Sequence, residues 1–472
     1  MKVIKNYLYN AGYQILLMFA PLITTPYVSR VLGAHNTGIN EYTNSWVTFF
    51  YLVGQLGITL YGNREIAYNR DDFFKRSKTF WEIESLQACT MTFTLIAYLS
   101  AVFIFSTTYK EYFLLQTLWI CATALDVSWF FMGLEDFRKT VVRNTLVKLI
   151  TICLIFAFVK TADDLWKYIL LLGVAQIGGN ITLWPYLKDT VCKVPIHQLR
   201  PFKHFYPAFL LFIPTITTQV YLVVNRLMLG RMATPSDLGN FTYADRLVKL
   251  ILALATATGS VMLPNVAKKF ADHDIEGVRQ SLYDSFDFVS AISFPMMFGL
   301  MAIAEKFAPW FLGDQYLNTG QIMVIESPII VFIAWSTVTG NQYLMPVNRI
   351  REYTMSVTVG AIINIIANFF LIHLYAANGA AMATVISEFC VTAYQLHAIR
   401  TTIKRRRLFA STWKYLCAAL AMYFVVHSFD QIMNMTIVNL AVQIAIGALI
   451  YILALFLIKA PVIDQAKKIL KK

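Results

Sequence analysis

The segment Phe19-Ala-Pro-Leu-Ile-Thr-Thr25 reappears as Phe212-Ile-Pro-Thr-Ile-Thr-Thr218, with five of seven positions matching in one register. An arginine, two glycines and a tyrosine then follow each copy in the same order, ending at Tyr42 and Tyr243. Two apolar helices could share Pro and Thr by chance, but the ordered later matches favour an internal repeat. We therefore expect two related halves, each opening with a Pro-kinked helix.

The composition around this repeat is that of a membrane protein. The 472 residues are 57% hydrophobic and only 14% charged, with a mean hydropathy of +0.56. Soluble domains carry roughly 45–50% apolar and about 25% charged residues. A soluble enzyme of this composition would lack a polar surface, and a disordered chain needs the opposite balance, so both classes are excluded.

Apolar stretches long enough to cross a bilayer recur from end to end. A spanning helix needs roughly 20 apolar residues. We predict an all-α polytopic protein with about 14 such spans, over residues 7–29, 42–62, 85–107, 112–134, 144–159, 168–187, 205–225, 239–264, 286–304, 321–346, 353–373, 376–397, 413–429 and 432–458. Residues 353–397 must be split near Asn378-Gly379.

The positive charges orient these spans. With the N-terminus inside, the inner side holds 31 Lys and Arg residues and the outer side holds 7. This asymmetry fits the positive-inside rule with both termini cytoplasmic. The net charge of +13 is thus an orientation signal, and no nucleic-acid partner is expected. Six spans separate the two copies of the repeat, which makes it a parallel repeat of the kind known in alternating-access transporters.

Basic residues inside or at the ends of spans suggest an anion site. Arg246 and Lys249 lie about 12–16 Å deep in their span, and intramembrane charges are functional-site hypotheses by default. Lys249 has no evident local partner, whereas Arg246 has the alternative of a structural pair with Asp245. Arg30 and Arg226 end two polar helix stripes, with snorkelling to the headgroups as their alternative. We predict that these four cations bind an anionic substrate such as a phosphate or pyrophosphate.

Uncharged polar residues step along the same helices at about four-residue spacing and predict a water-filled cavity between the two halves. The candidate lining residues are Gln14, Thr25, Gln55, Thr218, Gln219 and Asn225.

Three intramembrane acids, Asp126, Glu326 and Glu388, are candidates for ion coupling, with helix packing or a structural hydrogen bond as their alternative. The six cysteines and seven histidines show no metal-ligand spacing, so no metal and no cofactor is expected beyond coupling to a proton or sodium gradient. Gly33 and Gly38 have a P-loop spacing, but the required Lys and Ser/Thr are absent. No ATP hydrolysis or other enzymatic activity is predicted.

Several motifs resemble one family. Pro21-Leu-Ile-Thr-Thr-Pro26-Tyr27-Val-Ser-Arg30-Val-Leu-Gly33 resembles the first helix of bacterial polysaccharide transporters, the Wzx-type flippases of the multidrug/oligosaccharidyl-lipid/polysaccharide (MOP) exporter superfamily. Further similar segments are Tyr61 to Ala67, Leu125 to Phe137, Ser260 to Pro264 and Gly379 to Glu388, so the resemblance covers roughly residues 6–400.

The resemblance implies two six-helix lobes related by a pseudo-twofold axis around a cationic cavity, followed by two extra helices. The lobes would cover residues 1–190 and 204–400, with a cytoplasmic linker at 191–203 and the extra helices and a basic tail at 401–472. Family members often carry an acid before the basic residue of helix seven, but here Asn225 precedes Arg226.

The implied function is movement of oligosaccharide repeat units on undecaprenyl pyrophosphate from the inner to the outer leaflet of the bacterial cytoplasmic membrane. A polysaccharide polymerase and other assembly proteins are the expected partners, besides the bilayer itself. The alternatives are a lipid II flippase and, with less support from the short outer loops, a membrane polysaccharide polymerase. A drug exporter of the same superfamily would have an acidic rather than a basic cavity.

Overall fold

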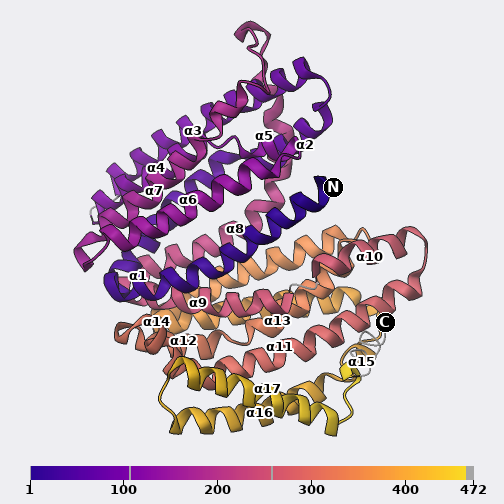
Figure 1. The fold of residues 1–472 in the computed structure, drawn as a ribbon. Coiled ribbons are helices and arrows are strands. Elements are labelled where there is room, and N and C mark those ends of the chain that lie inside the picture. Colours follow the sequence, from indigo (N-terminus) through magenta and orange to yellow (C-terminus); the bar gives the residue numbers. More distant parts are fainter. Residues whose placement is uncertain (1, 106–107, 257–258, 464–472) are drawn as a thin grey trace. The chain divides into compact units, whose positions relative to one another are not determined.

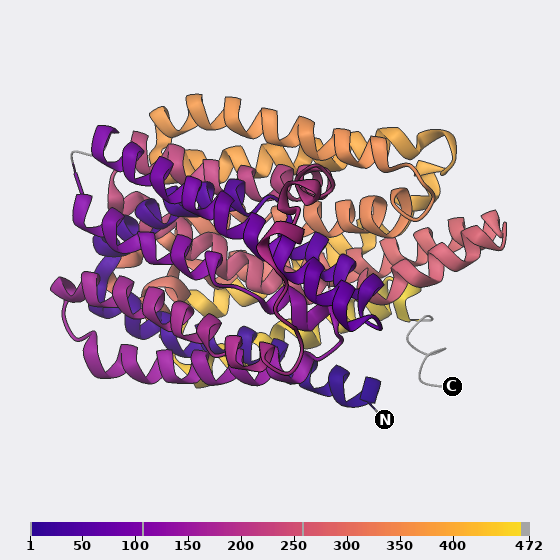
Figure 2. The same cartoon turned by 90° about the horizontal axis from the view of Figure 1, so that it is seen from above.

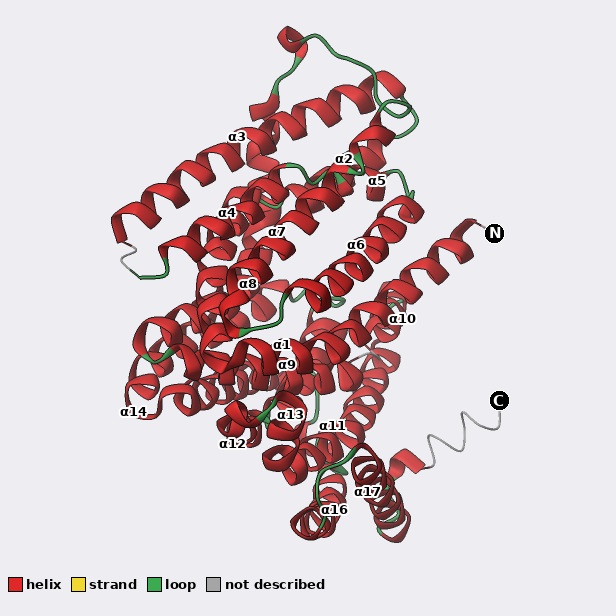
Figure 3. Ribbon diagram, turned by 60° about the vertical axis from the view of Figure 1, so that its left-hand side comes forward, coloured by secondary structure: helices red, strands yellow, loops and turns green. Residues whose placement is uncertain are grey.

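The computed structural model describes residues 2–105, 108–256 and 259–463. Side chains are described within these ranges except at 2–19, 137–139, 213–218, 220–222 and 259–262. The described chain consists of helices joined by short loops, without a strand (Figure 3). The predicted all-α fold is therefore confirmed. The chain divides into two compact units, residues 1–230 and 231–472. The lobe boundaries expected from the sequence stay a prediction.

The first unit is a bundle of long helices that run alongside one another (Figures 1 and 2). Its helices are α1 (Lys2–Gln55), α2 (Ile58–Asn69), α3 (Phe73–Phe105), α4 (Lys110–Ala124), α5 (Ser128–Gly133), α6 (Phe137–Phe158), α7 (Leu165–Ile181) and most of α8 (Phe205–Met232). A short 3-10 turn, η4 (Pro201–His204), precedes α8.

The second unit begins within the last turn of α8. Its helices are α9 (Pro235–Thr256), α10 (Gly259–Ala271), α11 (Ile275–Leu312), α12 (Leu317–Glu326), α13 (Ile329–Ser336), α14 (Ile350–Ala398), α15 (Arg405–Leu408), α16 (Thr412–Ile432) and α17 (Ile437–Leu457). A π-helical stretch, Thr337–Leu344, continues α13. The two C-terminal helices pack on this unit, with α16 lying between α11 and α17.

Breaks in the long helices fall where the backbone leaves the helical region. Gly33, at φ 74°, divides α1 into two helices, and a glycine adopts this conformation without a Cβ clash. Ala376, at φ 47°, divides α14 two residues before the Asn378-Gly379 split that the sequence predicts. Between α12 and α13 the chain bends by 46° at Ser327-Pro328, because proline cannot donate the next helical hydrogen bond.

Among the described residues, eight helices are long and apolar enough to cross a membrane, and the bent α12–α13 pair makes a ninth candidate. The count of about 14 stays a prediction. The expected span at 239–264 falls on α9, which ends at Thr256, and on α10, which begins at Gly259, and residues 257–258 lie outside the described residues.

The core of the first unit is aromatic. Trp129 and Phe130 of α5 pack on Phe80 of α3, with ring centroids 5.7 and 4.9 Å from the Phe80 ring. Gly62 of α2 lies directly against Trp129, where an added Cβ would come within 2.4 Å of the indole. The segment Trp129 to Phe137, the most specific part of the family resemblance, therefore serves first as packing that fixes α2 and α3.

Candidate functional site

The first unit joins Arg226 of α8 to Glu41 of α1. The Arg226 Nη1 atom lies 3.6 Å from Glu41 Oε2, and the two side chains are 26% and 5% exposed. Asn225, beside Arg226, is also buried. A carboxylate thus lies beside this arginine, supplied from another helix. The sequence analysis did not single out Glu41, which precedes the second predicted span by one residue.

The other predicted cation and cavity-lining residues of this unit lie on the same two helices. The Arg30 side chain is exposed and precedes the Gly33 break, and Thr25 is partly buried. The Gln55 Nε2 atom donates to Thr59 Oγ1 at 2.9 Å, and Gln219 is exposed. Gln14 and Thr218 lie outside the described side chains. The structure therefore places Arg226 in an ion pair and leaves the shared cavity as a prediction.

In the second unit, Lys249 has a partner that the sequence analysis overlooked. Its Nζ atom lies 2.5 Å from Asp245 Oδ1, one turn earlier on α9. Side chains four residues apart share a helix face, so the expectation of no local partner was wrong. Asp245 is buried and Lys249 is 33% exposed. The exposed Arg246 guanidinium lies 5.7 Å from the centre of the Tyr243 ring.

The three intramembrane acids occupy different settings. The Asp126 Oδ1 atom accepts a hydrogen bond from the Ser128 backbone N–H at 2.9 Å, which stabilises the turn into α5. Glu326 is fully buried at the end of α12, next to the bend. Glu388 is partly buried on α14. The contact of Asp126 supports its structural alternative, while ion coupling by these acids stays a prediction.

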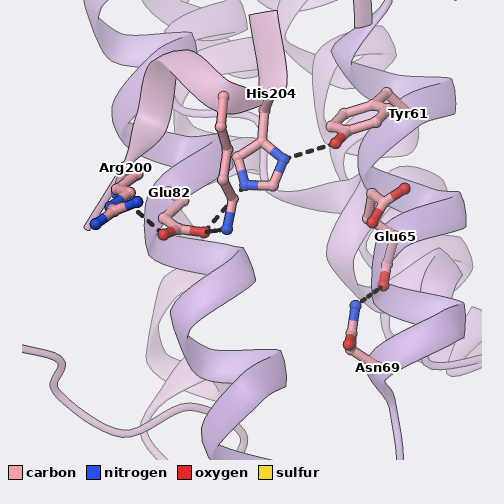
Figure 4. A network of polar contacts seen from close by, with 7 residues as sticks. Tyr61, Glu65, Asn69, Glu82, Arg200 and His204 are labelled. Atoms are coloured by element: carbon pink, nitrogen blue, oxygen red, sulfur yellow. Dashed lines mark hydrogen bonds and ion pairs between the residues drawn. The ribbon is translucent and has the colours of Figure 1, made fainter. Parts of the chain in front are cut away.

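A second polar cluster joins α2, α3 and η4 (Figure 4). The His204 ring bridges the Tyr61 hydroxyl, 2.6 Å from Nδ1, and the Glu82 carboxylate, 3.0 Å from Nε2. Glu82 also accepts from the Arg200 backbone N–H at 3.0 Å and pairs with Lys203 at 2.5 Å. Burial lowers the pKa of His204 against the opposing effect of Glu82, so the ring is neutral at pH 7.

Sequence reasoning missed this cluster because the predicted span began at residue 85, whereas α3 begins at Phe73 and carries Glu82 within it. The only available signal was an acid next to an apolar span.

The described residues offer fixed cations and carboxylates. They contain no group of three or more His, Cys, Asp or Glu side chains that could hold a metal ion. Paired ions of this kind can bind and release a charged ligand as their partners exchange.

Comparison with known proteins assigns this arrangement to a class. A solved structure of the lipid II flippase MurJ in an inward closed conformation matches with a TM-score of 0.75 and 16% identity, covering 96% of this chain and 98% of that one. An inward-facing MATE-family multidrug resistance transporter of the MOP superfamily matches with a TM-score of 0.62 and 14% identity, covering 83% and 95%. The fold is therefore shared with both of these solved structures, and the protein is a multi-pass membrane protein.

The family follows from the sequence comparison. The model of the polysaccharide biosynthesis protein family matches residues 3–270, and the chain belongs to this family. A relative named "Putative O-antigen transporter" from Escherichia coli K12 is 24% identical over 409 residues, covering 84% of this chain and 96% of its own length. The lipid II flippase MurJ of Bacillus subtilis is 23% identical over 155 residues, covering 32% and 28%. The resemblance to polysaccharide flippases is thus confirmed.

Proposed function

We propose that this protein moves undecaprenyl-pyrophosphate-linked oligosaccharide repeat units from the cytoplasmic to the outer leaflet of the bacterial inner membrane. The match to the polysaccharide biosynthesis family over residues 3–270 carries this proposal. The O-antigen transporter relative, aligned over nearly its whole length, adds support. The product would be used by a polysaccharide polymerase, and both termini would lie in the cytoplasm.

The proposed head-group residues are Arg30 and Arg226 in the first unit, and Arg246 and Lys249 in the second. Guanidinium and ammonium groups are the side chains that bind diphosphates most strongly. The ion pairs of Arg226 with Glu41 and of Lys249 with Asp245 neutralise two of these cations. An arriving diphosphate would compete with each carboxylate for its cation, which makes binding reversible.

Gln14, Thr25, Gln55, Thr218, Gln219 and Asn225 would line the path of the sugars. Coupling to a proton or sodium gradient would use Glu388, Glu326 or Asp126. These assignments are separate from the identity of the substrate and are tested separately, by substitution in the same transport assay.

Deletion of the gene in its host tests the function. Lipid-linked intermediates are extracted and their leaflet is probed with an impermeant label. Complete repeat units confined to the inner leaflet support the proposal. Complete units that reach the outer leaflet but fail to lengthen would instead indicate a polymerase.

A lipid II flippase is the second candidate, because the MurJ structure matches over 96% of this chain. Expression of the protein in cells depleted of their own lipid II flippase separates the two. Failure to rescue growth, together with loss of surface polysaccharide on deletion, supports repeat-unit transport, whereas rescue of growth supports lipid II.

A further inference from the structure

Two cavities follow each other along α3 within the first unit. The first, of about 530 Å³, is polar and is lined by Tyr61, Glu65, Lys75, Lys78, Lys203 and His204. The second, of about 560 Å³, is apolar and is lined by Phe49, Phe50, Val53, Phe93, Phe202 and Phe205. Neither is lined by the proposed head-group residues.

The chain itself joins the two cavities. Along η4 and the start of α8, Phe202 and Phe205 line the apolar cavity, while Lys203 and His204 between them line the polar one. On α3 the polar lining ends at Glu82 and the apolar lining begins at Cys89, a separation of about 10 Å along the axis. The apolar cavity thus lies next to the polar cavity, in the order in which an acyl chain follows the head group of a lipid.

The polar cavity has one cation in excess. Within it, Lys203 is paired with Glu82 at 2.5 Å and Lys75 with Asp72 at 3.6 Å. Glu65 lies 3.4 Å from Arg64. Lys78 is partly buried and, among the described residues, makes no ion pair or hydrogen bond.

With His204 neutral, the unmatched charge of the polar cavity is a single ammonium. A partly desolvated ammonium without a counter-ion is unfavourable, and one monoanion would neutralise it.

The apolar cavity offers a surface that a hydrocarbon chain can contact. Phe93 and Phe202 on its rim are 74% and 71% exposed. A soluble phosphate would fill only the polar cavity and leave these rings uncovered.

We propose that these two cavities together bind one monoanionic phospholipid, with its phosphodiester on Lys78 and an acyl chain against Phe93 and Phe202. A polyprenyl pyrophosphate carries more negative charge than the single unmatched ammonium balances, so the site fits a bulk lipid such as phosphatidylglycerol rather than the transported substrate. The site is independent of the transport proposal, because lipid binding is measured without transport.

The test uses the full-length protein released from nanodiscs of equal phosphatidylglycerol and phosphatidylethanolamine, with retained lipid counted by native mass spectrometry. Wild-type protein is expected to retain one phosphatidylglycerol in preference to phosphatidylethanolamine. Lys78→Gln should reduce that preference at least about tenfold, which corresponds to roughly 1.4 kcal/mol of binding free energy. The matched control Lys193→Gln removes an exposed lysine from the linker outside both cavities and should leave it unchanged.

A second variant tests the apolar half without changing charge. Cys89 is exposed and lines the apolar cavity, so Cys89→Trp fills that space without overpacking a core. It should lower retention of both lipids, with the elution profile of the folded protein unchanged. Equal lipid retention by wild type and Lys78→Gln would overturn the proposal. The proposal would also be overturned if glycerol phosphate alone displaced the bound phosphatidylglycerol. The same conclusion would follow if undecaprenyl pyrophosphate displaced the bound lipid at a lower concentration than added phosphatidylglycerol does.

Discussion

Arg226 of α8 and Glu41 of α1 form an ion pair of 3.6 Å between helices that are distant in sequence. The pair puts a carboxylate next to the first cation of helix α8, whose neighbour in the sequence is the uncharged Asn225. A carboxylate in this place can hold the arginine until an anionic ligand replaces it.

Removing either partner of this pair should affect stability and transport differently. Arg226→Gln leaves the buried Glu41 carboxylate without this cation and should cost about 1–2 kcal/mol of unfolding free energy, between the values of exposed and buried pairs. Glu41→Gln should cost less and keep the cation. A double-mutant cycle on detergent-solubilised protein measures the coupling. In the leaflet assay, Arg226→Gln should flip at least tenfold more slowly, and wild-type rates in this variant would remove Arg226 from the head-group residues.

Lys249→Gln should reduce transport at a cost in stability like that of Arg226→Gln. Its pair with Asp245 lies on one helix and Lys249 is 33% exposed, but Asp245 is buried, so the variant should lose about 1–2 kcal/mol of unfolding free energy. Loss of a diphosphate contact should slow flipping tenfold or more. The control Lys268→Gln removes an exposed lysine of the same unit near the end of α10. Similar rates for both variants would argue that Lys249 is structural.

The first unit should lose stability below neutral pH through His204. Its folded-state pKa lies below the ordinary value of about 6.5, so the unfolded chain takes up a proton first as the pH falls. The stabilising effect is complete above about pH 7 and declines as the pH falls through 6.5 towards the folded-state pKa.

Thermal melting between pH 5 and 8 checks this behaviour. His204→Gln retains a hydrogen-bond donor to Glu82 but does not titrate, so its melting temperature should vary less over this range. The exposed His197 provides the control, and His197→Gln should follow the wild-type curve. A wild-type curve that is flat from pH 5 to 8 would contradict the neutral bridge between Tyr61 and Glu82.

Two glycine substitutions should act in opposite directions. Gly62→Ala places a Cβ 2.4 Å from the buried Trp129 ring and should destabilise the protein by about 1–3 kcal/mol. Gly178→Ala, within helix α7, meets nothing within 4 Å and should be neutral or stabilising by up to about 1 kcal/mol. Melting temperatures of the purified variants measure the difference. Equal effects would show that the packing of α2 on Trp129 is looser than described.

The sequence by itself determined the features that depend on one-dimensional patterns. Apolar runs predicted the all-helical membrane fold, because a backbone in lipid must satisfy its hydrogen bonds within each segment. The motifs Pro21 to Gly33 and Leu125 to Phe137 pointed to the family that the comparison then showed. Asn378-Gly379 located the break in α14 to within two residues.

Only the tertiary structure decided which charges meet. Glu41 and Arg226, or Glu82 and His204, come together because separate helices pack at particular heights and rotations, and hydropathy carries no information on either. The same holds for the adjoining polar and apolar cavities along α3, whose walls come from three or more elements. Lys249 and Asp245 differ, since their four-residue spacing on one helix was readable in the sequence and was overlooked.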